Sequence, residues 1–147
     1  MSKHAETVTL DPDYVLDEQI GYLLRLAGQR HAAIFQAQIS DGLTPTQFST
    51  LIRISEHGQV SQNHLGRLAA MDVATIKGVV DRLKAKGLVA AKPDPGDKRR
   101  SNICLTETGA GLIADLKVDG LRITEETLAP LSAGERKTLA RLLRKIC

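Results

Sequence analysis

Cysteine is scarce in this chain of 147 residues, which contains only Cys104 and Cys147. Two cysteines so far apart in the sequence make neither a disulfide framework nor a metal-ligand cluster, as is typical of a protein from a reducing compartment. The four histidines are scattered and lack the paired spacing of metal ligands. We therefore expect no bound metal and no other cofactor.

Long apolar segments are also missing. No apolar run approaches the roughly 20 residues of a membrane span, and the N-terminus lacks the pattern of a signal peptide. We therefore expect a soluble, cytoplasmic protein that does not contact membranes. Its length suits one domain, or one small domain plus helices that pack against something else.

The sequence contains no recognisable catalytic motif. It has no nucleophile paired with a base in a known motif, no Gly-rich phosphate loop and no recognisable pair of carboxylates. We predict that the protein is not an enzyme.

The positive charge is concentrated in the middle of the chain. Residues 61–104 contain nine lysines and arginines against four acids, a net charge of +5, whereas the rest of the chain carries −2. Such a basic middle is typical of a segment that meets a polyanion. An uneven surface charge without a partner is the alternative.

The most informative stretch runs from Met71 to Gly87. Asp72 is a suitable N-cap and Gly87 a suitable C-terminal stop, so the stretch predicts a helix of about four turns over residues 72–87. The apolar residues of this helix share one face at i, i+3, i+4 and i+7, which predicts a buried stripe of Ile76, Val79, Val80 and Leu83.

The opposite face of this helix is polar and basic. Its first turn is slim, with Val73, Ala74 and Thr75, and its cations Lys77 and Arg82 come later. A helix of this kind can enter the DNA major groove, reading base edges first and touching phosphates further back. An ordinary solvated surface helix is the alternative.

Two shorter helices precede the central one. Thr44, Pro45 and Gln47 form a capping box with proline at the first helical position, which predicts a helix that ends at Gly58. Ser61 is expected to cap a second short helix, and a tight turn at residues 69–71 follows. Together with the central helix they predict a helix-turn-helix unit.

A two-stranded hairpin is expected after the central helix. Residues 88–92 and 101–105 read as strands, and the turn-forming residues 93–97 separate them. Lys98, Arg99 and Arg100 lie at the hairpin tip, and Asp97 directly precedes them. A basic hairpin in this position is typical of a wing that places arginine in the minor groove.

Long helices are predicted on both sides of this unit. An apolar band without proline runs from Asp13 to about Ile39 and predicts a helix roughly 40 Å long. Thr106 is expected to cap a second long helix that ends near Leu128, and Ser132 to open a last one. Because the first helix is longer than so small a domain needs, we expect part of it to pack against a second chain.

Three stretches carry a family resemblance: LTPTQFSTL at 43–51, SQNHLGRLAAMDVATIKGVVDRLKAKGLV at 61–89 and DKRRSNICLTETG at 97–109. The last contains a wing Asp-x-Arg followed by Leu-Thr-x-x-Gly. From about residue 14 to its end, the chain resembles the MarR family of winged helix-turn-helix transcriptional regulators. The AMDxATIKGVxDRL form also resembles the branch that regulates catabolism of nicotinate-type and related aromatic acids.

The resemblance implies a mainly α fold with a small β-hairpin wing and long N- and C-terminal dimerisation helices. The expected parts are a polar tail at 1–12, a dimerisation region at 13–42 and 106–147, and a winged helix-turn-helix domain at 43–105. The family implies a homodimer that represses a pseudo-palindromic operator in double-stranded DNA until a small ligand releases it. Two central helices one DNA turn apart would place the half-sites about 10 base pairs apart.

The expected DNA contacts come from three places. By the match to the family, Arg99 resembles the minor-groove arginine and Asp97 its orienting partner. The wing 93–101 contributes these two residues together with Lys98 and Arg100. The complete set is Ser61, Gln62, Asn63, Arg67, Val73, Ala74, Thr75, Lys77, Arg82, Asp97, Lys98, Arg99 and Arg100.

The expected effector is a small aromatic carboxylic acid. The resemblance implies a pocket between the first, second and fifth helices, and all four aromatic residues lie in the first third of the chain. Tyr22, Arg25 and Gln29 share a helix face, where the guanidinium can bind a carboxylate while a ring stacks. Together with Phe48 they form the predicted ligand site. The alternatives are aromatic residues that only fill the core and an Arg25 that forms an interchain ion pair.

Two other functions remain open. The winged helix is reused for protein docking, so an interaction module that never touches DNA is one alternative. A redox-responsive repressor that uses Cys147 is the other, whereas Cys104 is expected to be a small apolar residue of a strand.

Overall fold

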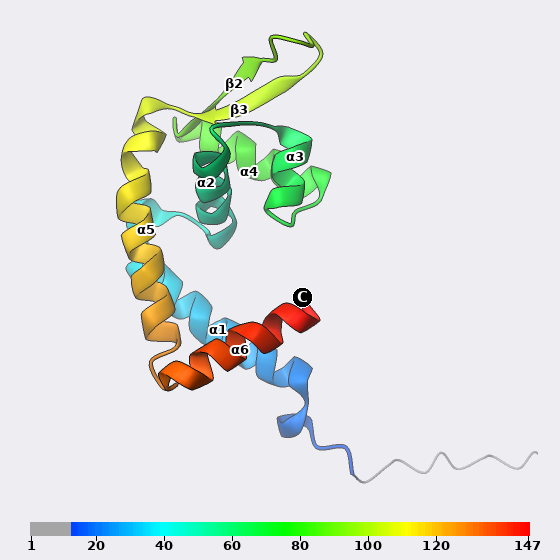
Figure 1. The fold of residues 1–147 in the computed structure, drawn as a ribbon, viewed down its shortest axis with the longest axis vertical. Coiled ribbons are helices and arrows are strands. Elements are labelled where there is room, and N and C mark those ends of the chain that lie inside the picture. The colour runs from blue at the N-terminus through cyan, green and yellow to red at the C-terminus, as the bar shows by residue number, and fades with distance from the viewer. Residues whose placement is uncertain (1–12) are drawn as a thin grey trace, which may run out of the picture.

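The computed structural model describes residues 13–147, so the predicted polar tail at 1–12 lies outside the described residues. The described chain is mostly helical with one small antiparallel sheet, as predicted (Figure 1). Its elements in chain order are η1 (Leu16–Glu18), α1 (Ile20–Gln38), η2 (Ser40–Gly42), α2 (Pro45–His57), β1 (Gln59–Ser61), α3 (Gln62–Leu68), α4 (Val73–Ala85), β2 (Val89–Pro93), β3 (Ser101–Leu105), α5 (Glu107–Thr127) and α6 (Ala133–Ile146).

The first helix is shorter than predicted. Its 19 residues correspond to about 28 Å instead of 40 Å. A single 3₁₀ turn, η1, precedes it, and Val15 and Gln19 on either side of that turn have extended backbones. Because Tyr14, Val15 and Leu16 are exposed and contribute to neither apolar core cluster, no packing extends the helix to Asp13.

The predicted helix caps are confirmed. The Thr44 hydroxyl accepts a hydrogen bond from the Gln47 N–H, and Gln47 Oε1 accepts one from the Thr44 N–H, which completes a capping box. Asp72 Oδ1 accepts from the Thr75 N–H at 2.7 Å, and Ser132 opens α6 with a second capping box. These hydrogen bonds satisfy N–H groups that a helix leaves free at its start.

The sheet has three strands instead of the predicted two. The strand order is β1-β3-β2, and both pairings are antiparallel. Val60 of β1 and Ala91 of β2 both face Ile103 of the central strand in register. No sequence pattern indicated β1, because three residues are too few to show an alternation.

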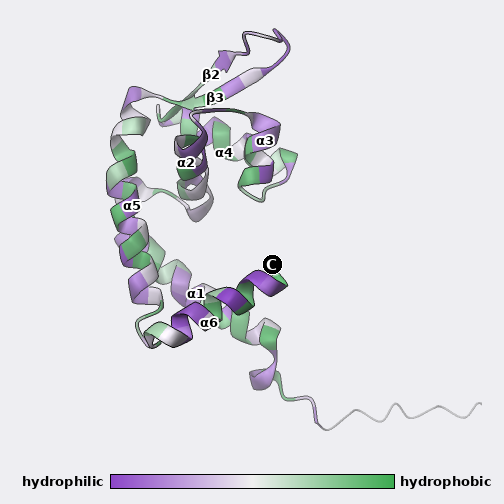
Figure 2. Cartoon of the chain, viewed as in Figure 1, coloured by the Kyte–Doolittle hydropathy of each residue, from purple (hydrophilic) through white to green (hydrophobic). Residues whose placement is uncertain are grey.

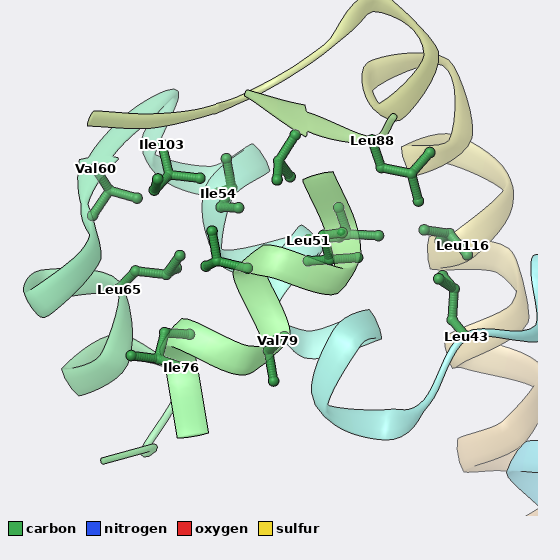
Figure 3. Packing of buried hydrophobic residues seen from close by; sticks show 13 residues of the cluster. Leu43, Leu51, Ile54, Val60, Leu65, Ile76, Val79, Leu88, Ile103 and Leu116 are labelled. Carbon is green, nitrogen blue, oxygen red and sulfur yellow. The ribbon is translucent and has the colours of Figure 1, made fainter. Parts of the chain in front are cut away.

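The core lies between the sheet and the helices α2, α3 and α4 (Figure 3). The predicted stripe of α4 is confirmed, since its four apolar residues are at most 4% exposed. Leu51 and Ile54 of α2 are completely buried, and Leu116 of α5 joins the same cluster. The stripe holds α4 by its apolar face and leaves the opposite face exposed.

A short turn connects the wing to α5, and its residues have structural roles. The Thr106 hydroxyl donates to the Gly87 carbonyl oxygen at 2.6 Å and accepts from the Gly109 N–H at 3.1 Å. At Gly109 any Cβ would overlap the Leu88 carbonyl oxygen. The Leu-Thr-x-x-Gly motif therefore fixes the start of α5 against the end of α4 and the start of β2.

The terminal helices lie at the opposite end of α5 from the wing (Figure 1). No residue of α6 is buried, and hydrophobic and hydrophilic residues alternate along it (Figure 2). Leu142 and Ile146 of α6, like Ile20 and Leu23 of α1, are 45–65% exposed. None of the helices in the described part of the chain is both long and apolar enough to cross a membrane.

Candidate functional site

The first turn of α4 is free of neighbours on its outer side. Val73 is 67% exposed, and Ala74 and Thr75 are exposed beside it. Hydrogen bonds from Thr75 hold the Asp72 carboxylate at the start of the helix and lower its pKa. The predicted slim leading turn is thus a capped helix end in contact with solvent.

The cations on α4 differ in their surroundings. Lys77 Nζ lies 2.8 Å from Asp81 Oδ2, and this ion pair raises the pKa of Lys77 and lowers that of Asp81. Arg82 is also exposed, and one of its guanidinium nitrogens lies beside Gly78. Part of the positive charge on the helix is therefore balanced locally by Asp81.

The turn between α3 and α4 is tight for a steric reason. The Met71 N–H donates to the Gly66 carbonyl oxygen at 2.8 Å, and Ala70 has a positive φ of 54°. A Cβ on Gly66 would lie 3.1 Å from the Met71 carbonyl oxygen and 3.2 Å from Ile76 Cγ2. The small residue at position 66 thus permits the close approach of the two helices.

A cationic hollow of about 380 Å³ forms where the start of α3 meets the wing. Three arginines contribute to it: Arg67 from α3, and Arg99 and Arg100 from the loop between β2 and β3. The structure thus brings together six of the residues predicted to contact DNA, although they lie up to 39 positions apart. The hollow is lined by Ser61, Gln62, Asn63, Arg67, Arg99, Arg100 and Ser101.

Asp97 organises the wing tip through the main chain. Its Oδ1 accepts from the Arg99 N–H at 2.9 Å, and its carbonyl oxygen accepts from the Arg100 N–H at 3.0 Å. The Asp97 carboxylate lies 3.9 Å from the Arg100 Nε. Asp97 contacts Arg99 through the Arg99 backbone N–H, whereas its charge pair is with Arg100. Lys98 is exposed between them.

A second hollow, which we call the inner cavity, lies between α1, α2 and α5, where the resemblance placed a ligand pocket. It measures about 240 Å³ and is lined by His31, Phe35, Pro45, Phe48, Gly120, Ile123 and Thr124. The rings of Phe35 and Phe48 meet edge to face, with 5.8 Å between centroids. His31 is the one titratable side chain in this lining, and its Nδ1 lies 2.9 Å from the Thr127 hydroxyl.

The predicted ligand residues do not all meet at this cavity. Phe48 lines it, whereas Tyr22, Arg25 and Gln29 lie earlier on α1 and do not. The Arg25 guanidinium lies 5.5 Å from the centre of the Tyr22 ring, so these two share a helix face as predicted. His31 and Gly120 line the cavity instead, and no local sequence pattern predicted either residue.

A larger hollow, the outer groove, runs along the other side of α2 and α5. It measures about 570 Å³ and is lined by Phe48, Ser49, Ile52, Arg53, Glu56, Lys117, Gly120, Leu121 and Thr124. Arg53 is held in place there, since its guanidinium donates to Glu56 and to the Leu68 carbonyl oxygen, both at 3.0 Å.

The two cysteines have different surroundings. Cys104 is buried in β3, with its Sγ 3.6 Å from the Ala90 carbonyl oxygen, as expected for a small apolar residue. Cys147 is exposed. In the described residues no group of three or more His, Cys, Asp or Glu side chains is arranged to hold a metal ion.

Comparison with known proteins assigns the family. The MarR family model matches residues 41–100. The transcriptional repressor NicR of Pseudomonas putida is 48% identical over 134 residues, which cover 90% of this chain and 85% of NicR. The chain belongs to the MarR family. Regulators of this family bind DNA and function as dimers, and the family and its relatives are transcriptional regulators rather than enzymes.

Two solved structures of MarR-type proteins match closely. A probable transcriptional regulator from Pseudomonas aeruginosa is 47% identical with a TM-score of 0.88, and the match covers 90% of this chain and all of that one. BpsR of Bordetella bronchiseptica, whose DNA binding is regulated by 6-hydroxynicotinic acid, is 40% identical with a TM-score of 0.85. The BpsR match covers 90% of this chain and 96% of BpsR.

Proposed function

We propose that this MarR-type repressor binds a pseudo-palindromic operator as a homodimer and is released from it by a small aromatic carboxylic acid. Helix 72–87 and wing 93–101 make the DNA contacts in this proposal. The observation that carries it is the cationic hollow at the junction of α3 and the wing, beside the exposed first turn of α4.

DNA recognition divides between base edges and phosphates. The side chains of Val73, Ala74 and Thr75 are short enough to let the backbone of α4 approach the floor of the major groove. Lys77 and Arg82 stand further back, at the level of the phosphates. The arginines around the hollow neutralise phosphates, and Arg99 reaches the adjacent minor groove.

Dimerisation uses the terminal helices. The apolar side chains that α1 and α6 expose in one chain have a combined pattern typical of an interface rather than of a solvated surface. We therefore assign 13–42 and 106–147 to dimerisation and 43–105 to DNA binding. Two α4 helices about 34 Å apart then face successive turns of the major groove on one side of the duplex.

The effector site is the inner cavity. Its walls are apolar and aromatic, and His31 provides one polar group, which suits a flat ring that carries a carboxylate. The similarity to BpsR supports an acid of the hydroxynicotinate type. Arg25, with Tyr22 and Gln29, remains a separate prediction: if it holds the carboxylate, Arg25→Ala should reduce binding of aromatic acids in calorimetry, and undiminished binding would dismiss it.

The test is a DNA-binding titration. Fluorescence anisotropy should detect tight, salt-sensitive binding to the DNA upstream of the gene for this protein and weaker binding to a scrambled duplex. Benzoate, nicotinate and 6-hydroxynicotinate, added separately, should reduce the affinity for the operator. A protein-docking module would bind both duplexes alike, and a redox-responsive repressor would respond to peroxide through the exposed Cys147 and lose that response in Cys147→Ser.

A further inference from the structure

The inner cavity and the outer groove share one wall. Three residues line both of them, namely Phe48 of α2 and Gly120 and Thr124 of α5. The inner cavity continues from this wall toward α1, and the outer groove continues toward Ile52 and Lys117. The two hollows are therefore neighbours that the side chains of this wall keep apart.

The Phe48 ring is the large side chain in the wall, and it is held from two sides. The Phe35 ring meets it edge to face at 5.8 Å. On the other side it lies directly against α5, because a Cβ on Gly120 would come within 2.9 Å of Phe48 Cζ. Only glycine at position 120 lets the ring occupy this place without a shift.

The volumes of the two hollows show how the wall limits the space open to a ligand. The inner cavity holds about 240 Å³, less than the roughly 300–1,000 Å³ that is typical of sites for drug-sized ligands. The outer groove adds about 570 Å³ on the far side of the ring. With the ring in place a ligand is confined to the smaller hollow, and without it the two hollows would join into one longer space.

We propose that Phe48, seated against Gly120, is a partition that restricts the effector to one aromatic ring. This inference rests on the proposed function, in which the inner cavity binds the effector. It makes Phe48 and Gly120 residues that determine ligand size, although neither contributes a charge or a hydrogen bond to the ligand.

The test measures the ratio of two affinities. Calorimetry of the full chain with benzoate and 2-naphthoate should give a preference for benzoate in the wild type. Phe48→Ala should raise the ratio of naphthoate to benzoate affinity about tenfold or more, since hydrophobic pockets discriminate size by factors of about 10–200. Phe48→Leu is a second, milder variant in case the alanine variant folds poorly, and it should shift the ratio in the same direction.

The matched control is Ile52→Ala, which enlarges the outer groove but leaves the partition intact. Its ratio should equal that of the wild type. Gly120→Ala should weaken benzoate binding when Phe48 is present, because the added Cβ displaces the ring, and should have little effect in the Phe48→Ala background. An unchanged ratio in both Phe48 variants, or an equal shift in Ile52→Ala, would overturn the proposal.

Failure of the proposed function would look different. If the wild type binds neither acid, the effector class is wrong, and the partition is then judged from crystals of wild type and Phe48→Ala under xenon, which occupies apolar cavities. Xenon positions that become continuous across the wall only in Phe48→Ala would support the partition. Two separate cavities in both proteins would refute it.

Discussion

Replacing Arg67 by glutamine should reduce the salt dependence of operator binding by a calculable amount. Arg67 lines the cationic hollow with Arg99 and Arg100 and is an exposed residue. Each phosphate that a protein neutralises contributes about −0.9 to the slope of log K against log salt concentration on B-DNA. A substitution in a dimer removes two such contacts, so the slope of Arg67→Gln should be shallower by about 1.8.

Arg99→Ala should behave differently from Arg67→Gln. An arginine in the minor groove contributes to operator recognition, so its loss should cost about 1–3 kcal/mol on the operator and less on a scrambled duplex. Arg67→Gln, in contrast, should weaken binding to both duplexes by a similar factor, because phosphates carry no sequence information. The dimer should stay intact in both variants, because neither residue belongs to α1, α5 or α6.

The assay is fluorescence anisotropy with a labelled operator at salt concentrations from about 50 to 300 mM, a range in which the slope is well determined. Arg122→Gln is the matched control once its dimer is verified by size-exclusion chromatography, since Arg122 is an exposed cation of α5 outside the hollow. An unchanged slope in Arg67→Gln, or an equal loss in Arg122→Gln, would refute the assignment of the hollow to phosphate contacts. Unchanged operator affinity in Arg99→Ala, with normal folding, would remove the wing from the mechanism.

Three further predictions concern the folded chain. Gly109→Ala should destabilise the folded protein by about 2 kcal/mol or more, because the added Cβ would overlap the Leu88 carbonyl oxygen. Gly111→Ala in the same helix places its Cβ in open space and should stabilise the protein by about 0.5–1 kcal/mol. Equal urea midpoints for the two variants would contradict this. Ser40→Ala should cost about 1.5–3 kcal/mol in the same assay, since the buried Asp119 carboxylate loses a 2.6 Å hydrogen bond, and an unaltered midpoint would show that this bond is not stabilising. The pKa of Asp72 is lowered in the folded protein, so its capping contribution to stability is complete above the ordinary pKa of 3.8 and is lost as the pH falls through the lower, folded value. The difference in urea midpoint between wild type and Asp72→Ala should therefore be constant at neutral pH and shrink in acid. A difference that persists in strong acid would count against the carboxylate as the cap.

The local features of this fold were predictable from the sequence. The capping boxes at Thr44 and Ser132 and the stripe of α4 depend on residues three or four positions apart, and the structure confirms each of them. The start of α1 was not predictable in the same way. Its apolar residues continue to Tyr14, but periodicity alone cannot show whether another surface covers them, and in the single chain none does.

The candidate site shows the same difference between local features and features that depend on distant packing. Six residues of the cationic hollow were among the predicted DNA contacts, because they lie in two segments that a helix-turn-helix and a wing bring together. The resemblance implied a pocket between the first, second and fifth helices, but of the residues predicted for it only Phe48 lines the inner cavity. His31 and Gly120 lie 89 positions apart in the sequence. They line one cavity only because α1 and α5 pack together, which no local sequence pattern can show.

The position of the inner cavity also determines how an effector could act. Its walls come from α1 and α5, which we assign to the dimer, and from α2, which we assign to the DNA-binding domain. A ligand in this cavity can weaken DNA binding only by as much as its affinities differ between the DNA-bound and the free arrangement of these helices. Linkage makes the coupling reciprocal, so an acid that weakens operator binding tenfold must itself bind tenfold less tightly to the operator complex. Because the linker from α1 to α2 is held to α5 by the Ser40–Asp119 hydrogen bonds, a shift of this linker relative to α5 would have to break or rearrange these bonds.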